Sequence, residues 1–311
     1  MRAAASAITV ELPELLALRA TAQQMTLPSA RLAVRQQQGR HRSRLRGRGL
    51  EFSEVRTYQA GDDIRTIDWR VTARRQQPHT KLFHEERERP VFLVCDQRHS
   101  LFFGSRTRYK SVQVARVVAL LSWLAWRSGD RLGGLVFGDN TLETHRPDQR
   151  RRALLGWLQQ VAQFNGQLRT TPAATKSRVS LEQVLAEACR VVRPGSLVVL
   201  CSDFHDLKAD TAAPLLHRLR RHGDVIALRV LDPLERALPD AGWLALEDDG
   251  KTLAVGSHNA KVRTAYANAC IARDAALQQL LNGLGIPLVD TDASDDADQC
   301  VARLLQVAGR R

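Results

Sequence analysis

The sequence has few aromatic residues, few cysteines and no long apolar run. Aromatic residues make up 5% of its 311 residues, and its 5 cysteines form no Cys-x-x-Cys pair. The cysteine spacing excludes a zinc or dithiol redox motif and predicts buried, reduced thiols. The longest strongly apolar run, from Val117 to Trp126, is far shorter than the about 20 residues that a membrane-spanning helix needs. The first residues also lack the apolar stretch of a signal peptide, so we expect no membrane span and a cytoplasmic location.

Apolar residues are nevertheless abundant enough for a core, at 44% of the chain, which excludes global disorder. The net charge of +13 is unevenly distributed, because residues 1–90 hold 17 basic and 10 acidic residues, a net +7. One segment, 31–48, contains arginines and no acid. Its arginines are Arg31, Arg35, Arg40, Arg42, Arg44, Arg46 and Arg48.

This arginine-rich arm has two interpretations. It can contact a polyanion, such as nucleic acid, acidic lipid or an acidic protein face, or it can pair with acids of its own fold. No aromatic residue lies in the arm, and the chain has no zinc finger or RNP-like motif. Nucleic acid is therefore the less favoured polyanion.

From residue 90 onward, continuous apolar runs alternate with helical patterns. The runs at 91–95, 131–137 and 196–201 are typical of strands buried on both faces. We expect further strands at 225–231 and 286–289 and a hairpin formed by 243–246 and 252–255. Helices are expected at 109–127, 148–163, 180–192, 209–222, 258–283 and 295–307. This alternation predicts a doubly wound, mostly parallel α/β sheet.

The first 89 residues have a different pattern. A short helix is expected to begin at Leu12, because Pro13 suits a first helical turn. Short strands at 51–58, 64–72 and 80–84, with a turn at 61–63, predict a small antiparallel β module. The predicted domains are 1–38 (N-terminal helix and linker), 39–89 (basic arm and β module) and 90–311 (α/β domain).

Two of the predicted buried strands end in aspartate. Asp96 ends the run at 91–95, and Asp203 follows the run at 196–201. Ligands of such sheets bind outside the carboxyl ends of the strands, and carboxylates there can hold a hard cation. Strand-end aspartates also cap helices and stabilise loops, so the spacing by itself leaves both roles open.

The stretch from residue 47 to residue 69, GRGLEFSEVRTYQAGDDIRTIDW, resembles the signature of the DUF-58 proteins. The resemblance continues through Arg74, Asp96, Lys110 and Ser202-Asp203, and covers about residues 10–230. It implies a von Willebrand factor A-like domain behind a small β insertion. It also implies a partner, because such proteins are typically encoded beside a MoxR-type AAA+ ATPase, with a chaperone-like role in maturing other proteins and no enzymatic activity.

A-domains of this kind often carry a metal-ion-dependent adhesion site, with the pattern Asp-x-Ser-x-Ser, a distant Thr and a later Asp. Here Asp96, Ser100 and Asp203 match that pattern, Ser180 is the nearest residue to the Thr position, and Arg98 replaces the first Ser. A guanidinium at that place repels a divalent ion and can pair with carboxylates. We therefore predict that Arg98 replaces the metal by bridging Asp96 and Asp203. The alternative is a Mg²⁺ site at Asp96, Ser100 and Asp203.

The signature residues themselves also have two interpretations. Their alternating charges can fix the β module onto the α/β domain, or they can form a docking face for the ATPase or its client. Trp69 is expected to be a core residue or an anchor between modules. Trp123 and Trp126 are expected to pack, and His99 and His205 are weak metal candidates. The signature residues are Arg56, Tyr58, Gly61, Asp62, Asp63, Arg65, Asp68, Trp69 and Arg74.

The sequence thus predicts a non-enzymatic interaction protein without a cofactor, acting with a MoxR-type ATPase on a client protein. The alternative is a polyanion-binding module that uses the arginine-rich arm. A hydrolase is disfavoured, because no Gly-x-Ser-x-Gly motif occurs and the glycines near Gly133 lack the Lys-Ser/Thr of a phosphate loop.

Overall fold

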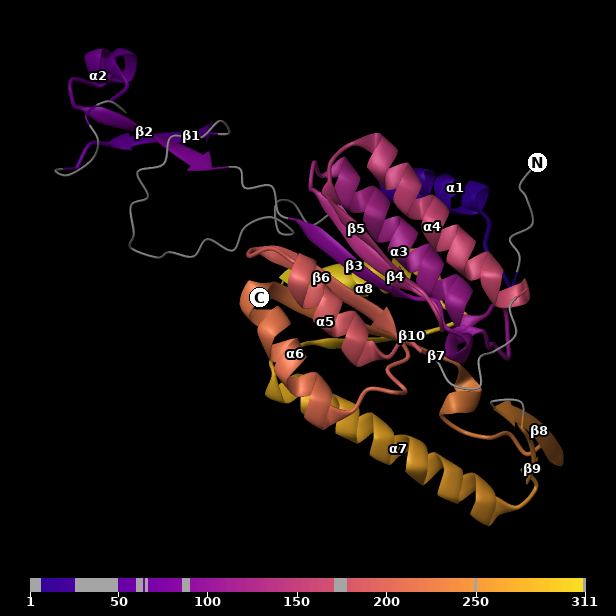
Figure 1. Cartoon of the computed structure of the whole chain (residues 1–311). Coiled ribbons are helices and arrows are strands. Elements are labelled where there is room, and N and C mark those ends of the chain that lie inside the picture. The colour runs from indigo at the N-terminus through magenta and orange to yellow at the C-terminus, as the bar shows by residue number, and fades with distance from the viewer. Residues whose placement is uncertain are drawn as a thin grey trace. The chain divides into compact units, whose positions relative to one another are not determined.

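A computed structural model of the chain describes residues 7–25, 50–59, 64, 67–85, 90–170, 178–248 and 251–309. The chain divides into two compact units (Figure 1). One unit comprises Met1–Leu32 with Arg89–Arg311, and the other comprises Ala33–Glu88. The N-terminal helix, expected in a separate segment 1–38 with a linker, therefore belongs to the α/β unit.

The α/β unit is built on a six-stranded sheet in the order β10-β7-β6-β3-β4-β5, in which only β5 is antiparallel. Every residue of β3, β4 and β6 is buried, because helices cover both faces of the sheet. This confirms the predicted doubly wound, mostly parallel sheet. The strands are β3 (Val91–Asp96), β4 (Leu132–Phe137), β5 (Leu142–Asp148), β6 (Ser196–Ser202), β7 (Gly223–Leu231) and β10 (Leu288–Asp292).

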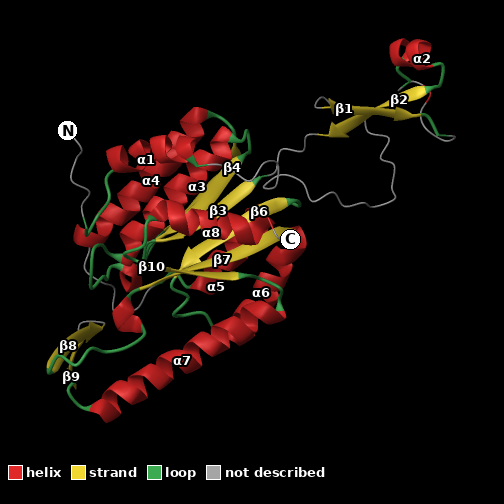
Figure 2. Ribbon diagram, turned by 180° about the vertical axis from the view of Figure 1, so that it is seen from behind, coloured by secondary structure: helices red, strands yellow, loops and turns green. Residues whose placement is uncertain are grey.

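Two helical layers enclose the sheet and make two cores (Figures 1 and 2). Helices α1 (Leu12–Gln24), α3 (Lys110–Arg127), α4 (Arg151–Thr170) and α8 (Ala297–Gly309) share one core. Helices α5 (Leu181–Val191), α6 (Ala209–His222) and α7 (Ala260–Gly283) share the other. Each predicted helix of this unit is present, and α4 ends at Thr170, beyond the expected end at residue 163.

Helix α1 is held against α3 by tryptophan and arginine side chains. The Trp123 indole donates from Nε1 to the Leu15 carbonyl at 3.0 Å, and the Arg127 guanidinium donates to the Met25 carbonyl at 3.0 Å. Arg19 lies over the rings of Trp123 and Trp126. The packing role predicted for these two tryptophans is confirmed.

The separate hairpin of β8 and β9 was predicted from the sequence, whereas the edge strand β5 of the main sheet was not. The hairpin of β8 (Trp243–Asp248) and β9 (Lys251–Gly256) is present as expected. Strand β5 was not predicted, because its sequence LETHRPD is polar. As an edge strand it is only half covered, so it needs no apolar run.

All 5 cysteines are free and buried, as predicted. Cys95 and Cys201 face each other as neighbours on β3 and β6. Burial raises the pKa of the Cys95 thiol to about 12, so the thiol stays protonated and unreactive at neutral pH.

The smaller unit contains β1 (Leu50–Thr57) paired antiparallel with β2 (His79–Glu85), which confirms the small antiparallel β module. The prediction of a strand at 64–72 is wrong. Helix α2 (Trp69–Arg75) begins there, because the Asp68 carboxylate caps it by accepting from Arg70 N at 3.0 Å and Val71 N at 3.2 Å. Among the described residues of the expected strand, Ile67 forms an isolated antiparallel bridge with Thr80.

Candidate functional site

The candidate site lies at the carboxyl ends of the adjacent strands β3 and β6. The loop after β3 leads to α3 on one face of the sheet, and the loop after β6 leads to α6 on the other. Such a divergence opens the place where doubly wound sheets bind ligands. Because Cys95 and Cys201 are register partners, Asp96 and Ser202-Asp203 end side by side.

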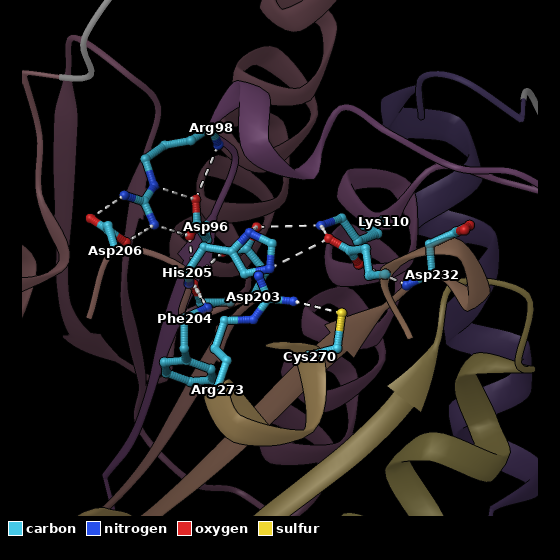
Figure 3. Close-up of polar contacts among 12 residues, drawn as sticks. Asp96, Arg98, Lys110, Asp203, Phe204, His205, Asp206, Asp232, Cys270 and Arg273 are labelled. Carbon is cyan, nitrogen blue, oxygen red and sulfur yellow. Dashed lines mark hydrogen bonds and ion pairs between the residues drawn. The ribbon is translucent and has the colours of Figure 1, made fainter. Parts of the chain in front are cut away.

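Arg98 binds two carboxylates (Figure 3). Its Nε and Nη2 donate to the two oxygens of Asp96 at 3.0 and 2.7 Å. Its Nη1 and Nη2 donate to the two oxygens of Asp206 at 2.7 and 3.0 Å. Both pairs are bidentate, which is the strongest arrangement available to a guanidinium and a carboxylate.

The predicted bridge is therefore correct for Asp96 and wrong for Asp203. The second carboxylate is Asp206, in the loop that follows β6. This loop turns at Phe204, whose φ is +57°, and Asp206 also accepts a hydrogen bond from Leu181 N at 3.2 Å. Asp203 is unavailable to Arg98 because another cation binds it.

That cation is Lys110, the first residue of α3. Its ammonium is fully buried and lies 3.3 Å from Asp203 Oδ2 and 2.6 Å from Glu235 Oε1. Glu235 ends the short 3-10 helix η3 (Pro233–Glu235), which the Asp232 carboxylate caps. The imidazole of His205 lies beside both acids, with nitrogens 3.9 Å from Asp203 and 3.6 Å from Glu235.

Hydrogen bonds complete the surroundings of Asp96. The Ser202 hydroxyl donates to Asp96 Oδ2 at 2.6 Å and accepts from Phe204 N at 3.1 Å. Arg98 N donates to Asp96 Oδ1 at 3.1 Å. Burial raises the pKa of Asp96, and the contacts with Arg98 and Ser202 oppose that effect. We treat Asp96 and Arg98 as an ionised pair, because a guanidinium keeps its proton and a neutral acid would lose one bidentate contact.

The second pair is ionised for a similar reason. Burial raises the pKa of Asp203, but Lys110, His205 and Arg98 together hold it below its ordinary value. Burial lowers the pKa of Lys110, and the charges of Asp203 and Glu235 reverse this and raise it. Each of the two buried cations is thus paired with two carboxylates at this edge of the sheet, so the carboxylates outnumber the cations.

The other predicted site residues lie around this centre without joining it. Ser100 is exposed in the 3-10 helix η2 (His99–Leu101). The Ser180 hydroxyl accepts from Gln183 N at 3.3 Å and caps α5. His99 N donates to Asp139 Oδ1 at 3.2 Å, and the His99 ring contacts the same carboxylate.

This donor set does not fit a divalent cation. Both Asp96 oxygens accept from Arg98, and the Lys110 ammonium lies against Asp203, so two positive charges stand where a metal would bind. In the described parts of the chain, no cluster of three or more His, Cys, Asp or Glu side chains is arranged to hold a metal ion.

Sequence reasoning did not place Ser202, Asp206, Lys110 or Glu235 in the site, although Lys110 and Ser202 are among the residues that carry the family resemblance. Ser202 and Asp206 flank Asp203 in the sequence, so that proximity was an available signal. Lys110 and Glu235 carry no local signal, because only the fold brings η3 to the start of α3.

The family signature lies in the smaller unit. Arg56 donates to the Thr57 carbonyl at 3.1 Å, and Arg74 lies in the last turn of α2. Trp69 is not a core residue of this unit, since it is 68% exposed at the first position of α2. Its role as an anchor between modules stays a prediction, as does the choice between scaffold and docking face for the signature charges. Tyr58 donates from its backbone N to the Pro78 carbonyl at 2.8 Å.

Other signature residues and the arginine-rich arm lie outside the described residues. They are Gly61, Asp62, Asp63, Arg65 and the segment 31–48. No helix of the described part of the chain is both long and apolar enough to cross a bilayer.

Comparison with known proteins identifies similar chains. The sequence profile of the family described as "Protein of unknown function DUF58" matches residues 54–276. Uncharacterized protein Rv1480 of Mycobacterium tuberculosis is 31% identical over 278 residues, covering 88% of this chain and 83% of the relative.

Two solved structures are also similar. An aerotolerance-related membrane protein from Bacteroides fragilis is 12% identical with a TM-score of 0.47, over 72% of this chain and 100% of that one. A von Willebrand factor type A protein from Catenulispora acidiphila is 10% identical with a TM-score of 0.36, over 74% of this chain and 43% of that one.

Proposed function

This chain belongs to the DUF58 family, and we propose that it is a non-enzymatic adaptor that works with a MoxR-type AAA+ ATPase on a client protein. In this proposal the carboxyl-end site is a degenerate adhesion site, in which the protein's own cations replace the metal. The site binds a partner, and no group in it transfers atoms or electrons.

The observation that carries the proposal is the pairing of each buried cation with one strand-end aspartate and one carboxylate from a loop. Arg98 joins Asp96 to Asp206, and Lys110 joins Asp203 to Glu235. Carboxylates whose oxygens accept hydrogen bonds from a buried cation are poor nucleophiles and poor general bases, because their lone pairs are already engaged.

The loop members of the site reach solvent and can recognise a partner. The Asp206 side chain is 38% exposed and that of His205 is 33% exposed, whereas Asp96 and Asp203 are fully buried. A rigid buried centre with a polar rim is an arrangement that favours recognition, because the rim side chains need little further ordering on binding.

Divalent metal ions should not stabilise the folded protein. We expect the same melting temperature in EDTA and in millimolar Mg²⁺ or Mn²⁺, because a ligand that binds the folded state would raise it. Differential scanning calorimetry of the full chain measures this. A rise with Mg²⁺ that disappears in Asp203→Asn would contradict the proposal that protein cations replace the metal.

The exposed side chains of the candidate site should contribute to binding of the ATPase. A purified MoxR-type ATPase from the same organism should bind the full chain, and His205→Ala should weaken binding by about tenfold, a loss of about 1.4 kcal/mol. His217→Ala is the matched control, because His217 is exposed on α6 away from the site and should leave binding unchanged. Biolayer interferometry with the purified ATPase gives the constants. The proposal fails if the ATPase does not bind, or if both variants weaken binding equally.

A further inference from the structure

The edge of the sheet opposite the candidate site carries exposed arginines. Strands β3, β4, β6 and β7 are parallel and begin in register, with Val91 paired to Leu132 and Leu197, and Leu197 paired to Asp224. Antiparallel β5 ends at the same edge, since Asp148 pairs with Leu132. We call the following six exposed arginines the basic edge: Arg150, Arg151, Arg152, Arg193, Arg218 and Arg221.

These arginines come from both helical layers. Arg150, Arg151 and Arg152 stand at the start of α4, Arg193 follows α5, and Arg218 and Arg221 lie near the end of α6. Backbone hydrogen bonds join the segments, from Gly195 N to the His222 carbonyl at 2.7 Å and from Leu197 N to the Pro90 carbonyl at 2.8 Å. From β7 to β5 the edge spans four strand spacings, or about 19 Å. The basic edge therefore extends along the sheet, from β7 to β5, and across it, from one helical layer to the other.

Its charge is not neutralised within the described part of the molecule. The nearby acids have other partners, because Glu187 binds Arg190 at 3.0 Å, Asp224 binds Arg220 at 3.1 Å and Asp148 accepts from the backbone of Arg150 at 2.8 Å. Among the residues that the structure describes, the side chains of the basic edge form no ion pair.

The position of the arginines on α4 adds to this imbalance. The positive end of a helix dipole disfavours cations, and Arg150, Arg151 and Arg152 stand at that end of α4. The carboxyl edge has the opposite character, with four carboxylates around two cations. An anionic partner at the basic edge would offset a repulsion that the fold itself leaves uncompensated.

The composition and shape of the basic edge favour a lipid surface over an acidic protein or a nucleic-acid duplex as its anionic partner. Protein interfaces centre on apolar or aromatic anchors, and the large exposed apolar side chains described in the α/β unit lie on other segments (Ile8, Phe103, Trp243, Leu253 and Ile271). Nucleic-acid duplexes are cylinders, which touch a broad face only along a strip. A lipid leaflet is extended in two directions, and its mobile headgroups can meet each guanidinium.

We propose that the basic edge binds the anionic headgroups of a membrane surface, as a peripheral contact made by electrostatic attraction to phosphate. Guanidinium groups form bidentate hydrogen bonds with phosphate oxygens, so arginine suits this role. The attraction adds up over the basic residues that lie near the surface and falls off within a Debye length, so binding weakens as salt rises.

The test compares two charge-matched variants of the full chain. The edge variant carries Arg151→Gln, Arg193→Gln, Arg218→Gln and Arg221→Gln. The control variant removes the same charge from exposed positions elsewhere, with Arg106→Gln, Arg169→Gln, Arg178→Gln and Lys261→Gln. Cosedimentation uses vesicles of equal parts phosphatidylglycerol and phosphatidylcholine, and vesicles of phosphatidylcholine alone. Thermal unfolding verifies that both variants fold.

We expect the wild type to bind the phosphatidylglycerol vesicles only, and the edge variant to bind them at least about tenfold more weakly. The control variant should bind at least several times more tightly than the edge variant. Equal binding by the two variants would overturn the proposal, as would the absence of binding to phosphatidylglycerol. Tighter binding to duplex DNA at the same phosphate concentration, with that binding lost in the edge variant, would assign the surface to nucleic acid instead.

Discussion

Replacing Arg98 with methionine should lower the free energy of unfolding by about 3–5 kcal/mol, the cost of leaving a buried charge without its partner. Arg98 provides both charge-assisted hydrogen bonds to the side chain of Asp96, a carboxylate with no exposed surface. After the substitution, Ser202 and one backbone N–H remain as donors, and neither carries charge. Urea unfolding at neutral pH, followed by circular dichroism, measures the loss.

Two further variants separate charge pairing from packing. Arg190→Met removes a guanidinium that is 76% exposed and paired with Glu187, and should change stability by less than about 1 kcal/mol. Adding Asp96→Leu to Arg98→Met should recover much of the loss, because no unpaired charge is then buried. If Arg98→Met costs no more than Arg190→Met, the pair does not hold the loop after β3 in place.

Lys110→Met should have an effect of similar size, about 3–5 kcal/mol at neutral pH, for the same physical reason. Its ammonium is the cation that Asp203 and Glu235 share, and without it two acids of like charge face each other. Methionine is chosen because it keeps the length of the lysine stem in a fully buried position, so the packing changes little.

The effect of Lys110→Met should also depend on pH. In the wild type the pKa of Asp203 is held below its ordinary value, so its contribution to stability is present above about pH 4 and is lost as the pH falls through the folded pKa. In the variant, burial is no longer opposed by Lys110 and raises that pKa, so protonation relieves the repulsion as the pH falls from neutral. The difference between the two proteins should therefore be largest near neutral pH and narrow toward pH 5. A difference that is constant over this range would show that lost packing, and not charge, is responsible.

The contribution of Lys110 to stability has the opposite pH dependence, because it is lost as the pH rises. The pKa of Lys110 is raised, so its contribution is complete below the ordinary lysine pKa of about 10 and is lost only as the pH rises through the folded value. Unfolding curves between neutral pH and pH 9 should therefore show a constant difference between wild type and Lys110→Met.

Much of the architecture could be predicted because it depends on local patterns. Runs such as VFLVCD in β3 and SLVVLCS in β6 are apolar without interruption, and only a strand covered on both faces accommodates them. Helix α5 begins at a capping box that the sequence displays, with Ser180 at its start and Gln183 three residues later. The polar edge strand β5 and the short helix α2 were not predicted, because neither has a pronounced apolar pattern in its sequence.

The sequence by itself determined the doubly wound sheet, the place of Asp96 at a strand end and the presence of a cation at Arg98. Each of these is a property of neighbouring residues, through burial periodicity and the two-residue step from Asp96 to Arg98. Only the tertiary structure decided how the charges are paired. Arg98 binds Asp206 because the turn at Phe204 brings that carboxylate back, and Asp203 binds Lys110 because α3 begins beside the end of β6. Ion pairing depends on distance and burial, and in this chain the partners are separated by as many as 125 residues.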